Sequence, residues 1–212
     1  MSGITKTKTH SKKTSRSDQG KTERVRNLRI EHWQKVKQIE PENLVFIDEM
    51  GVLLWLTRTH ARSYYGSRVY DFKPFYRGSK VTVIGAISLK KVLAVMTLDG
   101  SMNGKTFQVF VEKCLLPQLW EGAVIVMDNV PAHKVKEIEP LIQSVGASVL
   151  YQSPYSPDFN PIEHWWSQLK AFLRQFSPTT PKMVDVLIAT ALDLMNPKHL
   201  KNWFTHCCYC TS

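Results

Sequence analysis

The stretch NLVFIDEMG at residues 43–51 decides the fold, because it contains an apolar run that ends in an acid, Asp48. A second stretch, AVIVMD at residues 123–128, repeats this pattern and ends in Asp128. Runs with so few polar residues are typical of central strands that are covered on both faces. Ligands of open α/β sheets gather at the carboxyl ends of strands. If the two strands are neighbours, Asp48 and Asp128 lie side by side at one edge of the sheet.

A single strand-end aspartate has a simpler explanation, since aspartate commonly begins a turn. Two such strands in one chain favour a shared site over two unrelated turns. Two carboxylates at close range repel unless a cation lies between them, and Mg²⁺ prefers oxygen ligands.

Glu49 follows Asp48 and points to the opposite face of the strand. We therefore expect Glu49 to have a structural or supporting role.

The whole chain reads as a run of strands followed by alternating helices and strands. Expected strands cover residues 43–48, 52–57, 80–89, 92–98, 123–128 and 147–152, with turns at Met50–Gly51 and Lys90–Lys91. Expected helices cover residues 103–119, 132–144, 162–175 and 181–195. Short turns between strands indicate an antiparallel meander, and strands between helices indicate parallel crossovers. The order predicts an α/β fold, a mixed sheet with helices on its faces.

A third acid, Glu163, lies in the first turn of the helix expected over 162–175. Asn160 suits the N-cap and Pro161 the first helical position, so that Glu163 completes a capping-box pattern. That pattern explains a glutamate at this position without any catalysis. However, an apolar stripe that includes Ile162 and Trp166 predicts that the helix packs on the sheet. The start of the helix, with Glu163, then lies near the two aspartates.

Three motifs together resemble a known family. FIDEMG at 46–51, VMDNVPAHK at 126–134 and SPYSPDFNPIEHWWSQLK at 153–170 look like the catalytic motifs of DDE transposases, in the bacterial insertion-sequence branch of the mariner superfamily. The 34 residues between Asp128 and Glu163 are a typical separation for that superfamily. The similarity runs from about residue 40 to the C-terminus, and includes the strand RGSKVTVIGAIS at 77–88.

The resemblance implies a ribonuclease-H-like fold, with a mixed five-stranded sheet of three antiparallel strands followed by parallel strands, and helices on both faces. It also implies that Asp48, Asp128 and Glu163 hold two Mg²⁺ or Mn²⁺ ions. Such a site cuts DNA at a transposon end, and the freed 3′-OH then attacks target DNA, in this family usually at TA. The implied partner is double-stranded DNA, with a homodimer as a further expectation.

The charge of the chain is unevenly distributed. The 212 residues carry a formal net charge of +10, and residues 1–40 alone contain eleven Lys and Arg against four Asp and Glu. This pattern suggests a polyanionic partner, and a merely solubilising tail is the equally weighted alternative. We expect a disordered basic tail at 1–20, a basic amphipathic linker helix at 21–40 and the catalytic domain at 41–212. Relatives carry a helix-turn-helix region ahead of this domain, so we expect a separately encoded half or a truncated copy.

Several side chains are candidate contacts to DNA. Basic residues in the polar segment before the strand at 80–89, and at the second motif, suit phosphate contacts: Arg58, Arg62, Arg77, Lys80, His133 and Lys134. The alternative is an ordinary solvated loop and, for His133, a packed histidine, which we favour. Trp165 and Trp166 can stack on flipped bases, although their helical register places at least one of them in the core.

Cysteine usage and hydropathy indicate the compartment. With no signal peptide, Cys114, Cys207, Cys208 and Cys210 are expected to be reduced thiols. A zinc site near the C-terminus lacks the usual ligand spacing. No apolar run approaches the roughly 18–20 residues that span a bilayer. We expect a cytoplasmic bacterial protein associated with the nucleoid, without membrane contact.

Two other functions compete with transposition. One is a nuclease of the ribonuclease H type, against which the PYSPDFNPIE segment at 154–163 and the 34-residue separation argue. The other is a non-catalytic remnant that binds DNA or a full-length relative. A complete set of three acids argues against such decay.

Overall fold

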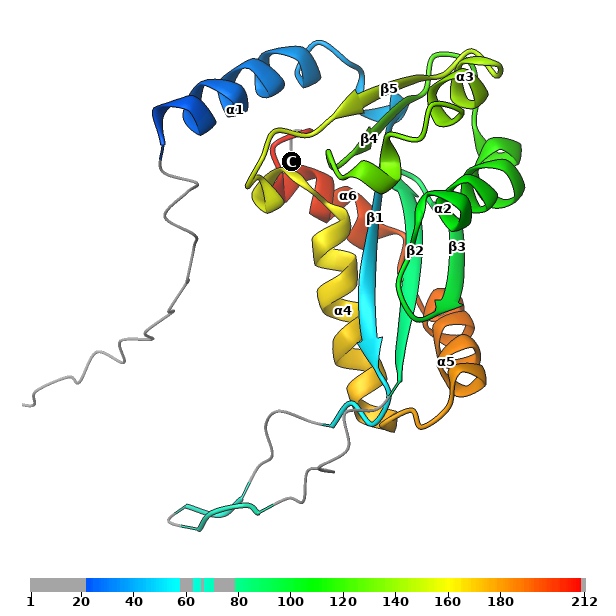
Figure 1. Cartoon of the computed structure of the whole chain (residues 1–212). Helices are drawn as coiled ribbons and strands as arrows, with labels where there is room; N and C mark the ends of the chain where they lie inside the picture. Colours follow the sequence, from blue (N-terminus) through cyan, green and yellow to red (C-terminus); the bar gives the residue numbers. More distant parts are fainter. Residues whose placement is uncertain (1–21, 58–62, 66, 71–78, 211–212) are drawn as a thin grey trace, which may run out of the picture.

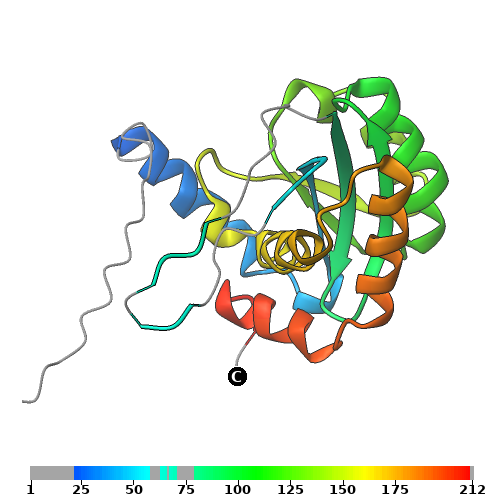
Figure 2. The same cartoon turned by 90° about the horizontal axis from the view of Figure 1, so that it is seen from below.

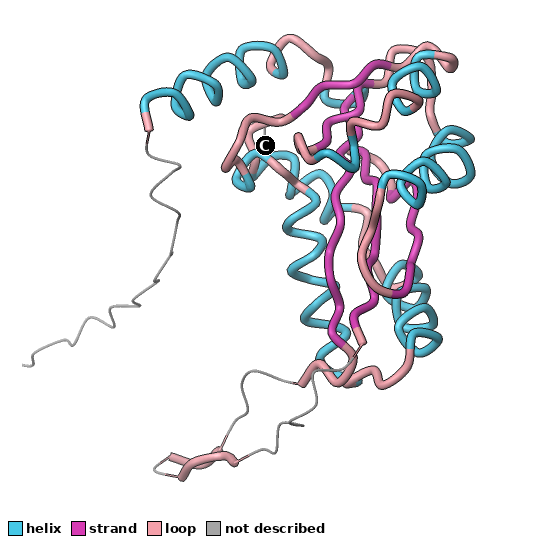
Figure 3. The backbone as a smooth tube through the Cα atoms, in the orientation of Figure 1, coloured by secondary structure: helices cyan, strands magenta, loops and turns pink. Residues whose placement is uncertain are grey.

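A five-stranded mixed sheet forms the centre of the molecule (Figures 1 and 3). The computed structural model describes residues 22–57, 63–65, 67–70 and 79–210. The strands are β1 (Leu44–Leu53), β2 (Lys80–Ser88), β3 (Val92–Asp99), β4 (Val124–Met127) and β5 (Ser148–Tyr151), in the spatial order β3-β2-β1-β4-β5. The first three pair antiparallel, whereas β1, β4 and β5 pair parallel. The expected mixed five-stranded sheet is confirmed.

Helices cover both faces of this sheet. They are α1 (Glu23–Val36), α2 (Gly104–Phe110), α3 (Ile138–Gln143), α4 (Ile162–Phe176), α5 (Pro181–Asp193) and α6 (Lys198–His206). A π-helical turn, Val111–Leu115, extends α2, and single 3₁₀ turns precede β1 (Pro41–Asn43) and follow the π turn (Leu116–Gln118), β4 (Pro131–His133) and β5 (Pro157–Phe159). None of the described helices is long and apolar enough to cross a membrane.

Alternation along β1 assigns its side chains to two separate cores. Phe46 and Met50 pack into the core shared with α4, α5 and α6, whereas Val45 and Ile47 pack into the core shared with α2 and α3. All four side chains are almost fully buried. Figure 2 views α4 along its axis (yellow), with α6 (red) beside it. Because successive side chains of a strand point to opposite faces, Asp48 belongs to the α4 face and Glu49 to the α2 face.

The expected turn at Met50–Gly51 is wrong. β1 runs without a break to Leu53, and each of its residues from Val45 onward pairs with β2. Gly51 faces Thr82, and a Cβ added to Gly51 would lie 2.5 Å from Cε of Lys80. The lysine stem therefore fills the space that the missing side chain leaves. Ladder hydrogen bonds along the whole strand outweigh the local turn preference of glycine.

The helix expected over 132–144 is also too long. Only the 3₁₀ turn and α3 form there. Pro140 has no N–H and its ring clashes with the carbonyl four residues earlier, so an α-helix has to begin close to it. α6 was not expected from the sequence, although Leu200, Trp203 and Phe204 follow a helical spacing.

α1 occupies most of the segment expected as a linker helix, and it docks on the loop that leads into α4. Arg29 donates to both carboxylate oxygens of Asp158, at 3.0 and 2.6 Å, and to the carbonyl of Tyr155 at 2.9 Å. The same guanidinium lies 4.4 Å from the centre of the Phe159 ring. Trp33, one turn further, stacks on Phe159 with ring centres 5.5 Å apart. These contacts fix α1 against the segment before Glu163.

Removing the Arg29 side chain should loosen α1. Hydrogen bonds to charged groups contribute about 1–3 kcal/mol, and both partners here are partly exposed, so we expect Arg29→Ala to cost about 1–2 kcal/mol of docking free energy. Amide hydrogen exchange across residues 23–36 should then accelerate by roughly 5- to 30-fold. Arg26→Ala is the matched control, because Arg26 is exposed on the same helix. Equal acceleration in both variants would contradict the docking role.

Candidate active site

Strand register brings the two aspartates to the same level of the sheet. Phe46 of β1 pairs with Val126 of the parallel strand β4, so Asp48 and Asp128, each two residues further, lie opposite one another. Asp128 follows the last residue of β4, as expected. Asp48, however, lies in the middle of β1 and not at its end, because β1 continues beside β2.

The Asp48 carboxylate is half-buried between β1 and α4. The indole N–H of Trp166 donates to Oδ2 of Asp48 at 3.1 Å. Burial, and then the negative charge of Glu163, raise the pKa of Asp48 to about 7. Burial disfavours the charged carboxylate, and a nearby like charge acts in the same direction. Glu163 precedes Trp166 by three residues on α4, so the contact of Trp166 with Asp48 brings the start of this helix near Asp48.

Glu163 lies in the first turn of α4, and its side chain is exposed. Among the described residues, the Glu163 side chain makes no hydrogen bond back to Asn160, so the capping-box explanation of Glu163 is wrong. The side chain of Asn160 instead accepts a long hydrogen bond of 3.4 Å from the N–H of Ile162. Ile162 and Trp166 are buried and hold α4 on the sheet. Glu163 is thus a solvent-accessible carboxylate near the half-buried Asp48.

Asp128 pairs with a buried histidine. Nδ1 of His133 lies 2.5 Å from Oδ1 of Asp128, and Nε2 lies 3.4 Å from Oε2 of Glu49. The imidazole packs against the ring of Phe107, with ring centres 4.3 Å apart. Burial alone would lower the pKa of His133, but the two carboxylates outweigh it and raise this pKa to about 9. A charged imidazolium therefore links Asp128 to Glu49 across the sheet.

His133 is not a DNA contact in this structure. Its side chain has no exposed surface, which agrees with the packed histidine favoured from the sequence. The link between His133 and Glu49 was missed, although the supporting role of Glu49 on the opposite face was expected. The two residues are 84 positions apart, and only the position of β4 beside β1 brings them together.

The three acids do not form a finished cation site. Among the described residues, no three His, Cys, Asp or Glu side chains lie close enough together to hold a metal ion. The structure brings Asp48 and Glu163 together, while the Asp128 carboxylate at the same level is turned toward His133. Carboxylate oxygens are nevertheless the donors that Mg²⁺ and Mn²⁺ prefer. Burial first, and then the negative charge of Glu163, raise the pKa of Asp48. A bound cation would offset both effects, so the donor set fits a divalent metal.

The remaining candidate DNA contacts differ in their exposure and in whether the structure describes them. Lys80 begins β2 and is exposed, and Lys134 lies over the ring of Tyr151, 5.3 Å from its centre. Arg58, Arg62 and Arg77 lie outside the described residues. Trp165 and Trp166 stack on each other with ring centres 4.5 Å apart, and both are buried. Both are therefore core side chains, which confirms the prediction from helical register that at least one of them lies in the core. Their burial leaves neither ring exposed to stack on a base.

The C-terminal cysteines form no metal cluster with other described side chains. All four cysteines are free thiols, as expected. Burial raises the pKa of Cys207 to about 12, so this thiol stays protonated. Cys207 belongs to the core between α6 and the sheet.

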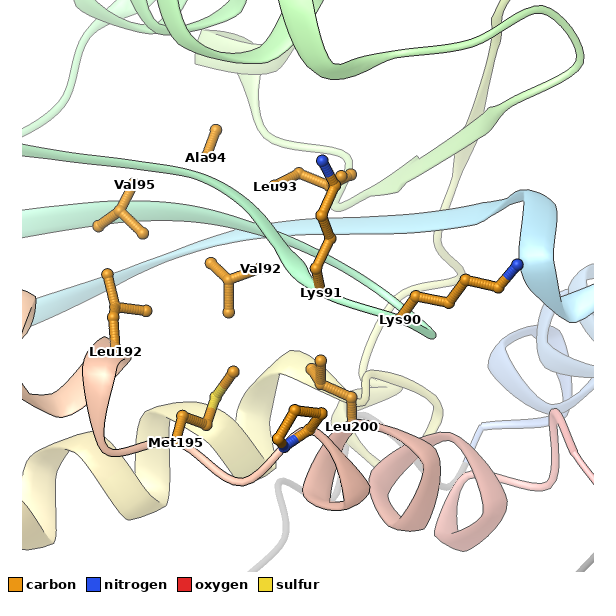
Figure 4. A pocket seen from close by; sticks show the side chains of 10 residues that line it. Lys90, Lys91, Val92, Leu93, Ala94, Val95, Leu192, Met195 and Leu200 are labelled. Carbon is orange, nitrogen blue, oxygen red and sulfur yellow. The ribbon is translucent and has the colours of Figure 1, made fainter.

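A cavity of about 470 Å³ lies between β3 and the junction of α5 and α6 (Figure 4). Its wall is mostly apolar and includes Val92, Leu192 and Met195, with Lys90 and Lys91 at one end. None of the three acids lines it. This cavity is therefore separate from the candidate active site.

Comparisons with known proteins agree with this arrangement. The sequence model of one family, described as DDE superfamily endonuclease, matches residues 43–183. No curated protein sequence matches the chain. In the pre-cleavage Mos1 transpososome, a chain 13% identical superimposes with a TM-score of 0.74, over 95% of this chain and 63% of that chain. The catalytic domain of Mos1 mariner transposase, 14% identical, superimposes with a TM-score of 0.64, over 91% of this chain and 90% of that chain.

A third structure, the Mos1 paired-end complex with Mg, is 17% identical and gives a TM-score of 0.71, over 97% of this chain and 64% of that chain. The chain thus spans somewhat less than two thirds of the Mos1 chains in these DNA complexes. At such low identities the structural likeness establishes the fold, which is the ribonuclease-H-like fold of transposase catalytic domains.

Neutralising Asp48 should stabilise the metal-free protein at neutral pH. Burial and Glu163 raise the pKa of Asp48 to about 7, so the folded chain binds this proton more tightly than the unfolded chain does. Ionisation of Asp48 therefore removes stability as the pH rises from about 4 through 7. We expect Asp48→Asn to raise the free energy of unfolding by on the order of 1–2 kcal/mol at pH 7.5, and by little near pH 4.

Urea denaturation at the two pH values, without divalent cations, measures this difference. Asp99→Asn is the control, because Asp99 is an exposed carboxylate at the end of β3. A loss of stability in Asp48→Asn at pH 7.5 would show that Asp48 is not under electrostatic strain.

Proposed function

The chain belongs to the DDE superfamily endonucleases, and from this membership we propose that it is the catalytic domain of a DNA transposase. The observation that carries the proposal is the arrangement of three acids on a ribonuclease-H-like sheet. Asp48 and Asp128 lie at one level of neighbouring parallel strands, and Glu163 lies in the first turn of the helix packed beside them. Within that superfamily we place the chain in the bacterial insertion-sequence branch.

Asp48, Asp128 and Glu163 would hold two divalent cations, Mg²⁺ or Mn²⁺. One support is the electrostatic repulsion between Asp48 and Glu163. Another is that two Mos1 structures of the same fold are complexes with Mg and with Mn. When bound, two such cations stabilise the attacking and leaving oxygens of an in-line phosphodiester displacement.

The protein's own residues prepare these acids. Trp166 donates to Asp48 from the α4 side, and the His133 imidazolium offsets the charges of Asp128 and Glu49 from the other side. Glu163 is exposed and is free to turn toward an incoming backbone phosphate and its cation. Rigid strands and a packed helix thus carry the acids, which limits the reorganisation that the reaction needs.

The reaction has two steps at this one site. Attack by water on the phosphodiester at the transposon end breaks the bond to the 3′ oxygen and leaves a free 3′-OH. That hydroxyl then attacks a phosphodiester of target DNA, for which we propose a TA dinucleotide. The new bond to phosphorus replaces the bond to the 3′ oxygen of the target strand, which leaves as a 3′-OH. Pairing of two transposon ends would need two chains, and a Mos1 structure is described as a paired-end complex. We therefore propose a homodimer on DNA.

The proposed division of the chain separates a basic N-terminal part from the catalytic domain. We propose that residues 1–20 act as a basic tail, that 21–40 link to a helix-turn-helix half encoded separately, and that 41–212 form the catalytic domain. The location that follows from this role is the bacterial cytoplasm, at the nucleoid. A non-catalytic remnant and a nuclease of the ribonuclease H type remain the competing functions.

Strand transfer tests the proposed function directly. With Mg²⁺ and a pre-cut end taken from the DNA that flanks the reading frame, the wild-type chain should join the end to target DNA, alone or with a separately supplied helix-turn-helix domain. Asp128→Asn should lower the rate by roughly a thousandfold, because a metal ligand supports several kcal/mol of transition-state stabilisation. Product formation is followed on sequencing gels.

Asp99→Asn, remote from the acids at the end of β3, is the activity control. Cleavage without joining would favour the nuclease. Neither product from the wild type would favour the remnant, and activity that survives Asp128→Asn would refute the site assignment.

The basic tail should contribute phosphate contacts. Each contact changes the slope of log K against log salt by about 0.9 on duplex DNA. Replacing the five Lys and Arg of residues 1–20 by Gln should therefore reduce the magnitude of that slope by about 2–4. Fluorescence anisotropy at several salt concentrations measures it, and the same number of Ser and Thr to Gln changes within 1–20 provides the control. An unchanged slope would mean that the tail does not contact DNA.

A further inference from the structure

Trp166 makes a hydrogen bond that core packing does not require. It is 1% exposed, and its ring lies in the core between α4 and the sheet. Within this apolar core its indole N–H reaches Oδ2 of Asp48 at 3.1 Å, across 118 positions of sequence. An indole donor has a partner here only because a carboxylate stands in the middle of a central strand.

A missing side chain on the neighbouring strand makes this contact possible. Gly85 of β2 pairs directly with Asp48 of β1, so any side chain at Gly85 would point to the same face as the carboxylate. A Cβ added to Gly85 would lie 2.6 Å from ring atoms of both Trp165 and Trp166. The stacked indoles therefore occupy the place of the absent side chain. This close approach brings the Trp166 N–H alongside Asp48.

From this geometry we infer that Trp166 is a positioning residue, which holds the Asp48 carboxylate in the orientation that a divalent cation needs. The inference rests on the metal site of the proposed function. Asp48 has Glu163 as a repelling neighbour, and an unrestrained carboxylate would turn away from it. The indole N–H holds Oδ2 of Asp48 toward α4. Hydrogen bonds to ligating carboxylates orient such ligands, and their loss commonly lowers metal affinity about 10- to 100-fold.

Trp165 supplies a matched control. It belongs to the same stack, with ring centres 4.5 Å from Trp166, and is 3% exposed. It also contacts the space above Gly85. Among the described residues, no hydrogen bond joins Trp165 to Asp48. Trp166→Phe and Trp165→Phe thus remove the same atoms from the same stack, and only Trp166→Phe removes a donor to Asp48.

Mn²⁺ binding by the purified full-length chain is the test, followed by calorimetry and by the electron paramagnetic resonance signal of free Mn²⁺. We expect Trp166→Phe to weaken Mn²⁺ binding at least tenfold, and Trp165→Phe to change it less than twofold, while both variants lose similar thermal stability. Equal weakening in the two variants, or none in Trp166→Phe, overturns the inference and leaves the metal site standing. Absence of Mn²⁺ binding by the wild type overturns both.

A measurement on the wild type covers the case in which Trp166→Phe does not fold. In nitrogen-15 spectra of the indole groups, assigned by triple-resonance experiments, Mg²⁺ should shift the N–H resonance of Trp166 more than that of Trp165. A Trp166 resonance that does not move at saturating Mg²⁺ overturns the inference.

Discussion

The pairing of β1 with two different neighbours is the constraint on which the rest of the structure depends. On one side, the parallel register with β4 places Asp128 at the level of Asp48. On the other side, the antiparallel register with β2 places Gly85 opposite Asp48. Because a slip of one residue turns every side chain to the other face, both registers have to hold for the acids and the stacked tryptophans to meet. The ten-residue length of β1, with its buried apolar faces, secures them.

The four carboxylates of the site differ in whether a positive side chain balances their charge. Asp48 is half-buried near Glu163, which raises its pKa, whereas Asp128 and Glu49 share the buried His133. Among the described residues, no positive side chain pairs with Asp48 or Glu163. The His133 imidazolium pairs with both Asp128 and Glu49. Sites that carry unbalanced charge reduce stability in return for function. A divalent cation at Asp48 and Glu163 would convert that cost into binding free energy.

Particular residues show how far sequence patterns reach. The apolar runs that end at Asp48 and Asp128 indicated central strands, and the stripe through Ile162 and Trp166 indicated the packed face of α4. The expected turn at Met50–Gly51 failed because pairing with β2 outweighs local turn preference. The capping pattern at Glu163 failed for a related reason. Local patterns describe what a segment favours alone, and tertiary contacts then select among those options.

The sequence by itself determined the α/β order of elements, the three acids and their spacing, because these follow from hydrophobic periodicity and from motifs that are contiguous in the chain. Only the tertiary structure decided that His133 lies between Asp128 and Glu49, that Trp166 donates to Asp48, and that Arg29 fastens α1 to the loop before Glu163. Each of these contacts joins segments from different elements. Such contacts depend on strand register and helix docking, which the summed packing of the whole chain sets and which no single segment encodes.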